Sequence, residues 1–524
     1  MRFGIGQPAT RKEDRRFLTG RGRYVADLDL ARQAYAVFLF SPHAHARIRA
    51  IDTAAARALP GVFSVLTGAD WAADGLGTLD PELMPEDMGG PKGFRTKRPP
   101  LATDRVRYVG ERVAVVIAAS EAVARDAAEL VSVDYEVLPA VVDAAEAVRP
   151  GAPVLHDGAA DNISVSVRMG NADAVAPAFA QAAHVTRMAL FNNRLTAVTM
   201  EPRGCIGDYD AGTDRYTLVT STQHVHGVRH LLAHILNVRE SRVRVVARDV
   251  GGGFGMKHPI YPEEALIVWA ARRIGRPVKW IPTRAESMLS DDQARDLRVE
   301  AELALDTDGR FLALRWTGVT NAGAYISGAG AIPLLFSLKL ASTVYDIPAV
   351  AVTSSFVLTN TAPTHPYRGA GRPEAVYIME RLVDQAAREM KIDPVELRAK
   401  NLIRPGAFPY QTRTGWTYDT GNYAAAMAKC QALADWQGYP GRRAASAAAG
   451  KCRGRGIVYY VDNTGIFNER MELRFDPDGE VTILAGTLSH GQGHETAYAQ
   501  MVADWLGVAE DKIHLAQADT DEVA

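Results

Sequence analysis

The stretch "VRVVARDVGGGFGMKHP" (residues 243–259) joins an apolar run typical of a β-strand to three consecutive glycines, followed by Phe254 and Gly255. Glycine within a structured region lowers stability unless the backbone needs an unusual conformation or another group approaches it closely. The loop is therefore either an ordinary turn or a place where a large group lies against the bare backbone.

Two further glycine-rich loops occur, at residues 364–375 ("THPYRGAGRPEA") and 486–500 ("GTLSHGQGHETAYAQ"). Both lead into a predicted helix, and the free N–H groups at a helix N-terminus form a natural anion site. One such loop alone is usually a turn, but three in one chain favour a large phosphate-bearing ligand. None matches a Walker A motif, and GGGFG is a poor match to GxGxxG, which argues against a generic nucleotide-binding dehydrogenase.

The composition is that of an ordinary globular protein, with 524 residues, 47% hydrophobic and 23% charged, enough for several domains. The formal net charge of -2 gives no general attraction to nucleic acid or to an anionic membrane. No apolar run approaches the ~18 residues of a membrane-spanning helix. The charged N-terminus lacks the apolar segment of a secretory signal, so we expect a cytoplasmic protein.

The three cysteines, Cys205, Cys430 and Cys452, lie far apart in the sequence and form no CxxC pair. An iron–sulfur cluster needs about four thiolates, and a structural zinc site needs three or four Cys or His ligands. The chain is therefore not expected to hold such a cluster alone or to depend on a disulfide framework.

Strand and helix patterns alternate along the chain and predict an α+β fold. We expect strands at 33–40, 62–68 and 105–118, then a helix from Ser120 and a further strand, in a first unit ending near residue 140. Residues 16–30 are predicted as loop and turn, and a Pro- and Gly-rich linker follows the first unit.

The rest of the chain gives clear signals for both kinds of element. Helices are predicted at 225–238, 262–275, 371–394 and 494–508. Asp-Gly turns predict β-hairpins at 304–316 and 474–486. The segment "GRGIVYYVDNTG" (454–465), with the strands after it, indicates a further α+β unit.

Eight segments, each weak alone, form a specific combination in this order: "RKEDRRFLTGRGRYVADL", "SPHAHARI", "VRYVGERVAVVIA", "MEPRG", "STQ", "DVGGGFGMK", "YRGAGRPEA" and "GQGHETAYAQ". The sequence resembles, from about residue 10 to its last residue, the large molybdopterin-binding subunits of molybdenum hydroxylases, the xanthine dehydrogenase, aldehyde oxidase and carbon monoxide dehydrogenase family. The resemblance implies an a/b hammerhead-like domain at 16–140, a first molybdopterin-binding domain at 160–420 and a second, partial one at 421–524.

The resemblance also implies roles for particular residues. Molybdenum would be held by the dithiolene of a pterin, most often molybdopterin cytosine dinucleotide in bacteria, with no protein side chain as metal ligand. Gln223 would donate a hydrogen bond to a molybdenum oxo ligand, and Arg368 would lie beside it. The backbone of Gly252, Gly253, Phe254 and Gly255 would approach the metal, and the pterin or its pyrophosphate would lie against Gly491, Gln492, Gly493 and His494.

The implied reaction is hydroxylation of an aldehyde or an N-heterocycle with water as the oxygen source. The two electrons released would leave through a small [2Fe–2S] subunit and a medium FAD subunit, because this chain has no motif for either group. Such three-subunit complexes commonly dimerise.

Two loops depart from the patterns of particular family members. Gly369 stands where strict carbon monoxide dehydrogenases have the cysteine that binds copper, so oxidation of CO is not expected. His258 follows Lys257 where xanthine-type enzymes have a glutamate, and Ala370 follows Gly369, so a purine substrate is not supported.

The general base of the family is a glutamate that would lie ~200 residues beyond the last residue here, an estimate from family layout and domain size. A general base must lie within hydrogen-bond reach of its proton. Glu111 is assigned to a strand and Glu480 to a hairpin turn, so neither is taken as the base. The sequence is thus expected to be a large subunit truncated at its C-terminus, either catalytic or an inactive cofactor-binding fragment.

Other polar residues have structural interpretations. His226 and His230 share a helix face, but no carboxylate completes a known zinc pattern, so we interpret them as structural. Glu201 in "MEPRG" is either an ion-pair partner of Arg203 or a residue that orients nearby groups, and it is not assigned a catalytic role.

Overall fold

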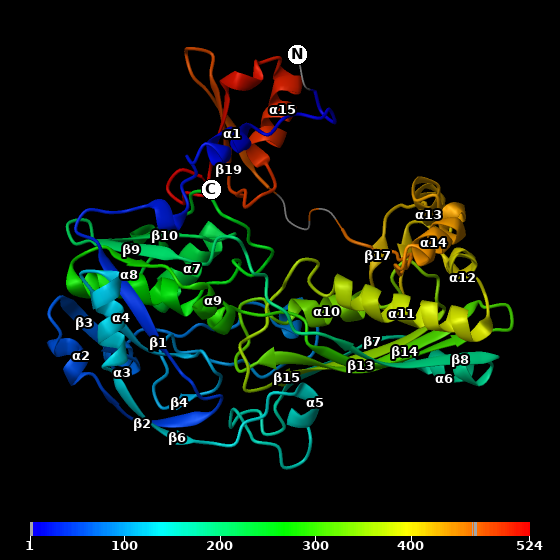
Figure 1. Ribbon diagram of the computed structural model, residues 1–524, viewed down its shortest axis with the longest axis horizontal. Helices are drawn as coiled ribbons and strands as arrows, with labels where there is room; N and C mark the ends of the chain where they lie inside the picture. Colours follow the sequence, from blue (N-terminus) through cyan, green and yellow to red (C-terminus); the bar gives the residue numbers. More distant parts are fainter. Residues whose placement is uncertain (1–3, 464, 466–468, 524) are drawn as a thin grey trace.

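The computed structural model describes residues 4–463, 465 and 469–523. Figure 1 shows two regions built around sheets that lie side by side, and a smaller region above the first that contains both ends of the chain. Among the described residues, no helix combines the length and the apolar character that a membrane span requires.

The largest sheet combines strands from the first 140 residues with strands from the middle of the chain, in the order β11-β10-β9-β12-β1-β5-β3. The two groups meet where β1 and β12 run parallel, with Ala34 opposite Val278. β5 is buried along its length and is apolar after Arg112, as expected for a strand with neighbours on both sides. The strands are β1 (Ala34–Phe40), β3 (Val62–Thr67), β5 (Arg112–Ala118), β9 (Cys205–Asp210), β10 (Arg215–Thr220), β11 (Val243–Val246) and β12 (Val278–Trp280).

Helices and a small second sheet complete this first region. Ser120 caps α4, because its Oγ accepts a hydrogen bond from the N–H of Val123, as the sequence predicts. α8 packs against β9, β10 and β12. The elements are α2 (Ala54–Ala58), α3 (Gly68–Ala73), α4 (Glu121–Glu129), α7 (Val225–Ile235), α8 (Pro262–Ile274), α9 (Arg284–Ser290), and a sheet of β4 (Arg105–Val106), β2 (Ala46–Asp52) and β6 (Ser132–Val137).

The second region is a five-stranded sheet in the order β7-β15-β14-β13-β8 with helices on both faces (Figure 1). Leu303 and Leu305 pack with α11, whereas Ala304 between them packs with α6, as the two-residue period of a strand requires. The predicted Asp-Gly hairpin is the turn between β13 and β14. The elements are α5 (Ala144–Ala147), β7 (Ile163–Gly170), α6 (Ala172–Ala180), β8 (His184–Asn192), β13 (Leu297–Leu305), β14 (Phe311–Gly323), α10 (Ile332–Lys339), β15 (Ala349–Leu358), α11 (Arg372–Met390) and α12 (Pro394–Asn401).

The third region consists of β18 (Met471–Phe475), β19 (Val481–Ala485), β20 (Ile513–Gln517) and α15 (His494–Leu506), with α1 (Lys12–Leu18) packed against α15. The backbone N–H of Lys12 donates to Thr496 Oγ1 (2.8 Å). Arg16 binds both Asp249 of the first region (2.8 Å) and Glu495 of α15 (3.1 Å). The N-terminal helix therefore attaches the third region to the first.

One local prediction was wrong. Residues 16–18, expected in a loop, belong to α1. The described residues of 454–465 form no strand of their own, and the side chains of Ile457, Tyr459 and Val461 pack on the core. Before them, β16 (Tyr410–Gln411), β17 (Thr417–Tyr418), α13 (Tyr423–Leu433) and α14 (Tyr439–Ala448) lie beside α12, far from β19 in Figure 1.

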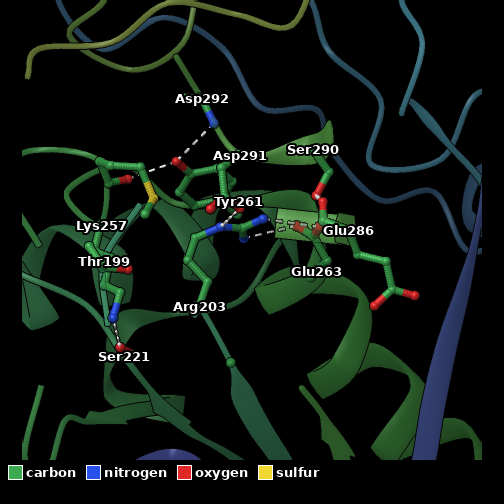
Figure 2. A network of polar contacts seen from close by, with 12 residues as sticks. Thr199, Arg203, Ser221, Lys257, Tyr261, Glu263, Glu286, Ser290, Asp291 and Asp292 are labelled. Carbon is green, nitrogen blue, oxygen red and sulfur yellow. Dashed lines mark hydrogen bonds and ion pairs between the residues drawn. The ribbon is translucent and has the colours of Figure 1, made fainter. Parts of the chain in front are cut away.

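A buried ion network joins distant parts of the first region. Glu263, at the start of α8, accepts hydrogen bonds from Arg112 Nε (2.8 Å) and from both terminal nitrogens of Arg203 (3.3 Å each). Arg203 also binds Asp291 (2.7 Å) and stacks on Tyr261, 3.6 Å from the ring centre. Figure 2 shows Arg203 between these partners. Burial opposes ionisation of Glu263, but the two arginines outweigh it and lower its pKa to about 2.

The first testable prediction concerns this carboxylate. Replacing Glu263 by Gln should lower the free energy of unfolding by about 3–5 kcal/mol, because Arg112 and Arg203 would stay buried without a counter-charge. Glu302→Gln is the control, since Glu302 pairs with Arg187 on an exposed face and should cost less than about 1 kcal/mol. Urea unfolding would measure both, and equal effects would contradict the prediction.

Candidate functional site

Gln223 lies where two of the glycine-rich loops meet, between β10 and α7. Its backbone N–H donates to the carbonyl of Lys257 (2.9 Å), and its Oε1 accepts from the N–H of Gly255 (2.8 Å). Its Nε2 donates to Nε2 of His490 (2.9 Å) in the third region. One amide side chain thus connects the loop after β11 with the loop before α15.

The glycines of the loop at residues 251–255 are required by close approach, which answers the question raised by the sequence. A Cβ on Gly253 would lie 2.3 Å from the side-chain carbon Cδ of Gln223. A Cβ on Gly255 would lie 2.2 Å from the carbonyl oxygen of Pro366, and the φ of Gly255 is +97°. A side chain at either position would push the loop away from Gln223 or from the loop that carries Arg368.

Arg368 lies on that neighbouring loop, and its side chain lies near Phe254 of the glycine loop. Its backbone N–H donates to the carbonyl of Phe254 (2.9 Å), and its guanidinium carbon is 5.9 Å from the centre of the Phe254 ring. Arg295 holds the loop by binding the carbonyl of Arg368 (2.7 Å) and the carboxylate of Glu374 (2.8 Å). The Arg368 side chain forms no ion pair within the described chain.

The loop before α15 contributes an imidazole that the sequence analysis did not single out. His490 Nε2 accepts from Gln223 Nε2 and from Gln492 Nε2 (3.1 Å), and burial lowers the pKa of His490, so the ring is neutral. The position of a Cβ on Gly491 has no atom within 4 Å, which leaves that backbone open. His490 immediately precedes the quoted motif "GQGHETAYAQ", and this adjacency was the only signal for it.

The predicted site residues thus fall into two groups. Gln223, Arg368 and the loop at 252–255 are bonded to one another, and Gln492 joins them through His490. Gly493 and His494 lie beside α1 and within α15: a Cβ on Gly493 would lie 3.4 Å from Arg11, and the His494 ring stacks on Tyr498. Within the described residues no hydrogen bond joins either of them to Gln223.

Glu201 orients the glycine loop and does not pair with Arg203. Its Oε2 accepts from Ser221 Oγ (2.6 Å), the N–H of Gly251 (2.8 Å) and Lys257 Nζ (2.9 Å). Lys257 is buried, and burial lowers its pKa although Glu201 opposes the shift. The sequence left open whether Glu201 pairs with Arg203 or orients nearby groups, and the structure contains the second arrangement. Figure 2 shows Lys257 bound to Ser221 in this cluster.

Three histidines, His224, His258 and His365, form a row of stacked rings that begins next to Gln223; we call it the histidine row. Ring centres are 4.7 Å apart between His224 and His258, and 5.8 Å apart between His258 and His365. Burial lowers all three pKa values, to about 3 for His258 and His365. The row is therefore an uncharged aromatic wall at neutral pH.

Glu111 and His230, to which the sequence analysis gave no catalytic or metal-binding role, form hydrogen bonds with other residues. Glu111 is buried, just before β5, and accepts hydrogen bonds from the N–H of Arg107 (2.5 Å) and from Tyr325 (2.7 Å). Glu480 lies in the turn between β18 and β19. His230 binds Glu240 (2.8 Å), and the described residues contain no group of three His, Cys, Asp or Glu side chains that could hold a metal ion.

Taken together, the site offers bare backbone, one amide, one free guanidinium and neutral imidazoles. Among the described residues it has no group of three His, Cys, Asp or Glu side chains that could hold a metal ion. Such a surface can bind and orient a large polar group.

The second testable prediction concerns the glycine loop. Gly253→Ala should lower the free energy of unfolding by about 1–3 kcal/mol, because the new methyl group overlaps the Gln223 side chain. Gly406→Ala is the control, since an added Cβ there meets nothing within 4 Å. If thermal unfolding shows the two variants to be equally stable, the close approach is not a constraint.

The third prediction follows from the histidine row. Because the folded pKa of His365 lies near 3, below its ordinary value of 6.5, the unfolded chain takes up the proton first as the pH falls. The free energy of unfolding therefore falls as the pH is lowered from about 6.5 to 3. This one group contributes a loss of about 1.4 kcal/mol per pH unit. His365→Leu should flatten the dependence measured by urea unfolding at pH 7, 6 and 5; parallel curves would contradict it.

Comparison with known protein families agrees with the family resemblance seen in the sequence. Residues 19–139 match the model "Aldehyde oxidase and xanthine dehydrogenase, a/b hammerhead domain". Residues 155–402 and 429–524 match two models of a molybdopterin cofactor-binding domain.

Curated relatives and solved structures agree with these matches. The nicotine 6-hydroxylase large subunit of Paenarthrobacter nicotinovorans is 35% identical over 97% of this chain and 63% of its own. The carbon monoxide dehydrogenase large chain of Hydrogenophaga pseudoflava is 34% identical over 99% of this chain and 67% of its own. The crystal structure of quinoline 2-oxidoreductase from Pseudomonas putida 86 superposes with a TM-score of 0.93 and 37% identity, covering 98% of this chain and 66% of that one.

The chain thus spans about two thirds of the length of the relatives it matches. The hammerhead and molybdopterin-binding matches, together with identities above 30% to several large subunits, identify the family. The chain belongs to the molybdopterin-binding large subunits of the xanthine dehydrogenase, aldehyde oxidase and carbon monoxide dehydrogenase family.

Proposed function

We propose that the chain is the molybdopterin-binding catalytic subunit of an oxidoreductase that hydroxylates an N-heterocycle or an aldehyde with water as the oxygen source. The observation that carries this proposal is the convergence on Gln223 of the glycine loop, which has no room for a Cβ at Gly253 or Gly255, and of the loop of His490, whose backbone is open at Gly491. Bare backbone beside a free guanidinium, Arg368, suits a large anionic cofactor.

The residues present fit a molybdopterin cofactor, in our proposal the cytosine dinucleotide form. The loop at 252–255 and the open backbone at Gly491 offer N–H groups without side chains in the way. His494 Nδ1 is buried without a hydrogen-bond partner, next to Gly493 at the N-terminus of α15, and is available to such a ligand. When bound, the molybdenum cofactor supplies the two-electron oxidation.

The chain's own residues bind and orient. Because the N–H of Gly255 occupies Oε1 of Gln223, the amide is fixed with Nε2 as its donor towards the site. His490 Nε2 accepts one hydrogen of that amide group and leaves the other for a cofactor oxygen. Arg368 supplies a positive charge beside Phe254, and Glu201 with Lys257 keeps the glycine loop in place.

An N-heterocycle is the substrate class that we favour. Two of the similar proteins are named for nicotine and quinoline, both aromatic N-heterocycles. The neutral rings of the histidine row next to Gln223 give a flat, uncharged molecule an aromatic surface. Gly369, in the position of the copper-binding cysteine, argues against CO as substrate.

Partner subunits would carry the electrons away. We propose a small [2Fe–2S] subunit and a medium FAD subunit, and a dimer of the resulting heterotrimer, in the cytoplasm. A further relative, 33% identical, is named as a subunit of the 6-hydroxypseudooxynicotine dehydrogenase complex, which supports a multi-subunit assembly. The domain limits at 16–140, 160–420 and 421–524 stay predictions.

The fourth prediction tests this function in the complex purified from its source cells. The complex should contain molybdenum and release CMP on acid hydrolysis, and it should oxidise quinoline or benzaldehyde with a dye as acceptor, incorporating ¹⁸O from labelled water. Gln223→Ala should lower kcat by roughly 10-fold or more while keeping the molybdenum content, because it removes one oriented donor.

The matched control is Gln437→Ala, an exposed glutamine whose loss should leave both values unchanged. A purified complex with neither molybdenum nor CMP would overturn the proposal. Molybdenum without turnover of either substrate would leave a cofactor-binding role and reject the catalytic one.

A further inference from the structure

A cavity of about 400 Å³ lies away from Gln223 and involves none of the predicted site residues. Its walls come from two segments: residues 94–107, which lead through β4 of the small sheet, and the loop at 156–158 that precedes β7. We call it the basic cavity, because four of the side chains that line it are cations: Arg95, Lys97, Arg105 and Arg107.

The charges in the basic cavity are unevenly paired. Arg95 forms ion pairs with Glu86 and Asp87, which do not line the cavity. Lys97 and Arg105 form no ion pair or side-chain hydrogen bond within the described chain, and Arg105 Nε is buried without a partner. Leaving a buried cationic donor unsatisfied is unfavourable, so an incoming oxyanion would gain from binding it.

Arg107 is fixed in position at the same wall. Its Nε donates to the carbonyl of Leu155 and its Nη1 to Tyr325, both at 3.2 Å. Neither of these contacts uses Nη2, and no other hydrogen bond within the described residues does. Glu111, which does not line the cavity, attracts Arg107, so Lys97 and Arg105 are the lining cations without a paired carboxylate. Two exposed carboxylates, Asp104 and Asp157, also belong to the lining.

Aromatic rings form the rest of the wall. His156 lies 5.8 Å from Phe94 and 5.5 Å from Tyr325 between ring centres, and its Nε2 binds the carbonyl of Ala324 (2.8 Å). Burial, then the charges of Arg107 and Arg105, lower the pKa of His156 to about 4, so the ring is neutral. Gly158 packs on Phe94, where a Cβ would lie 2.4 Å from the ring.

The volume decides between classes of anion. A cavity of about 400 Å³ is much larger than a single inorganic phosphate or sulfate needs and lies within the range of about 300–1,000 Å³ used for organic ligands. The two unpaired cations, Lys97 and Arg105, lie among carboxylates and suit a singly charged anion, and neutral rings suit a flat apolar body.

We propose that the basic cavity binds a small aromatic carboxylate, with its carboxylate on Arg105 and Arg107 and its ring against Phe94 and His156. The proposal does not rest on the function assigned to the Gln223 site, because the two sites share no residue. It gives the protein a second ligand site for an organic acid.

The fifth prediction tests this with benzoate as the probe and the purified protein complex, by calorimetry and saturation-transfer NMR. Benzoate should bind saturably, and neutral benzamide should bind at least roughly tenfold more weakly, because it lacks the charge that the arginines meet. Arg105→Gln should weaken benzoate binding by a similar factor. Arg49→Gln is the control, since Arg49 is an exposed arginine paired with Glu136 (3.5 Å) and should leave binding unchanged.

Each alternative result has a clear meaning. Equal affinity for benzoate and benzamide, or unchanged binding in Arg105→Gln, would overturn the proposal, as would binding of inorganic phosphate as tight as that of benzoate. Displacement of benzoate by quinoline would place the probe at the Gln223 site and reject this one. If Arg105→Gln does not fold, the exposed Lys97→Gln should still weaken binding, and molybdenum content should be unaffected throughout.

Discussion

The buried carboxylate of Glu263 is the interaction on which the first region depends. It holds two arginines from the two groups of strands in the large sheet, Arg112 at β5 and Arg203 just before β9. A charge so deeply buried is tolerated only because both are present. The parallel pairing of β1 with β12 needs the same relative position of these segments. Since β10 and β11 belong to this sheet, the network also determines where Gln223 and the glycine loop lie.

The positions of the site residues depend on this sheet and on close contacts between the loops. Neighbouring strands β10 and β11 deliver Gln223 and the glycine loop to the same edge of the sheet, and the lack of side chains lets the loop touch both the amide and the segment of Arg368. Glu201 then fixes the loop through one oxygen that accepts three hydrogen bonds. Charge is confined to the supports, Lys257 and Glu201, and to Arg368, while the imidazoles near the amide are neutral. This distribution favours binding of anionic groups at the backbone and of uncharged rings beside it.

Local signals in the sequence were sufficient to predict several helices and turns and to single out the glycine loop. The Ser120 cap, the Asp-Gly turns and the acidic first turn of α8 each act within a few residues, and each predicted its element. The glycine loop could be recognised because the cost of glycine implies a close neighbour. What could not be predicted depends on contacts between distant segments: Lys257 with Glu201, the histidine row, and His490 with Gln223. Ile457, Tyr459 and Val461 alternate along the chain and pack on the core although no strand forms there, so alternation alone does not indicate strand pairing.

The attachment of α1 to α15 has a consequence for the order of events during synthesis. Lys12 and its partner Thr496 are 484 residues apart, so the first helix to leave the ribosome finds its partner only near the end of the described chain. At about 5–20 residues per second, that is a delay of roughly 25 to 100 s. Until then the loop at 490–494 has no fixed place beside Gln223. The nascent protein therefore carries an open cradle beside Gln223 at least until these 484 residues have been made.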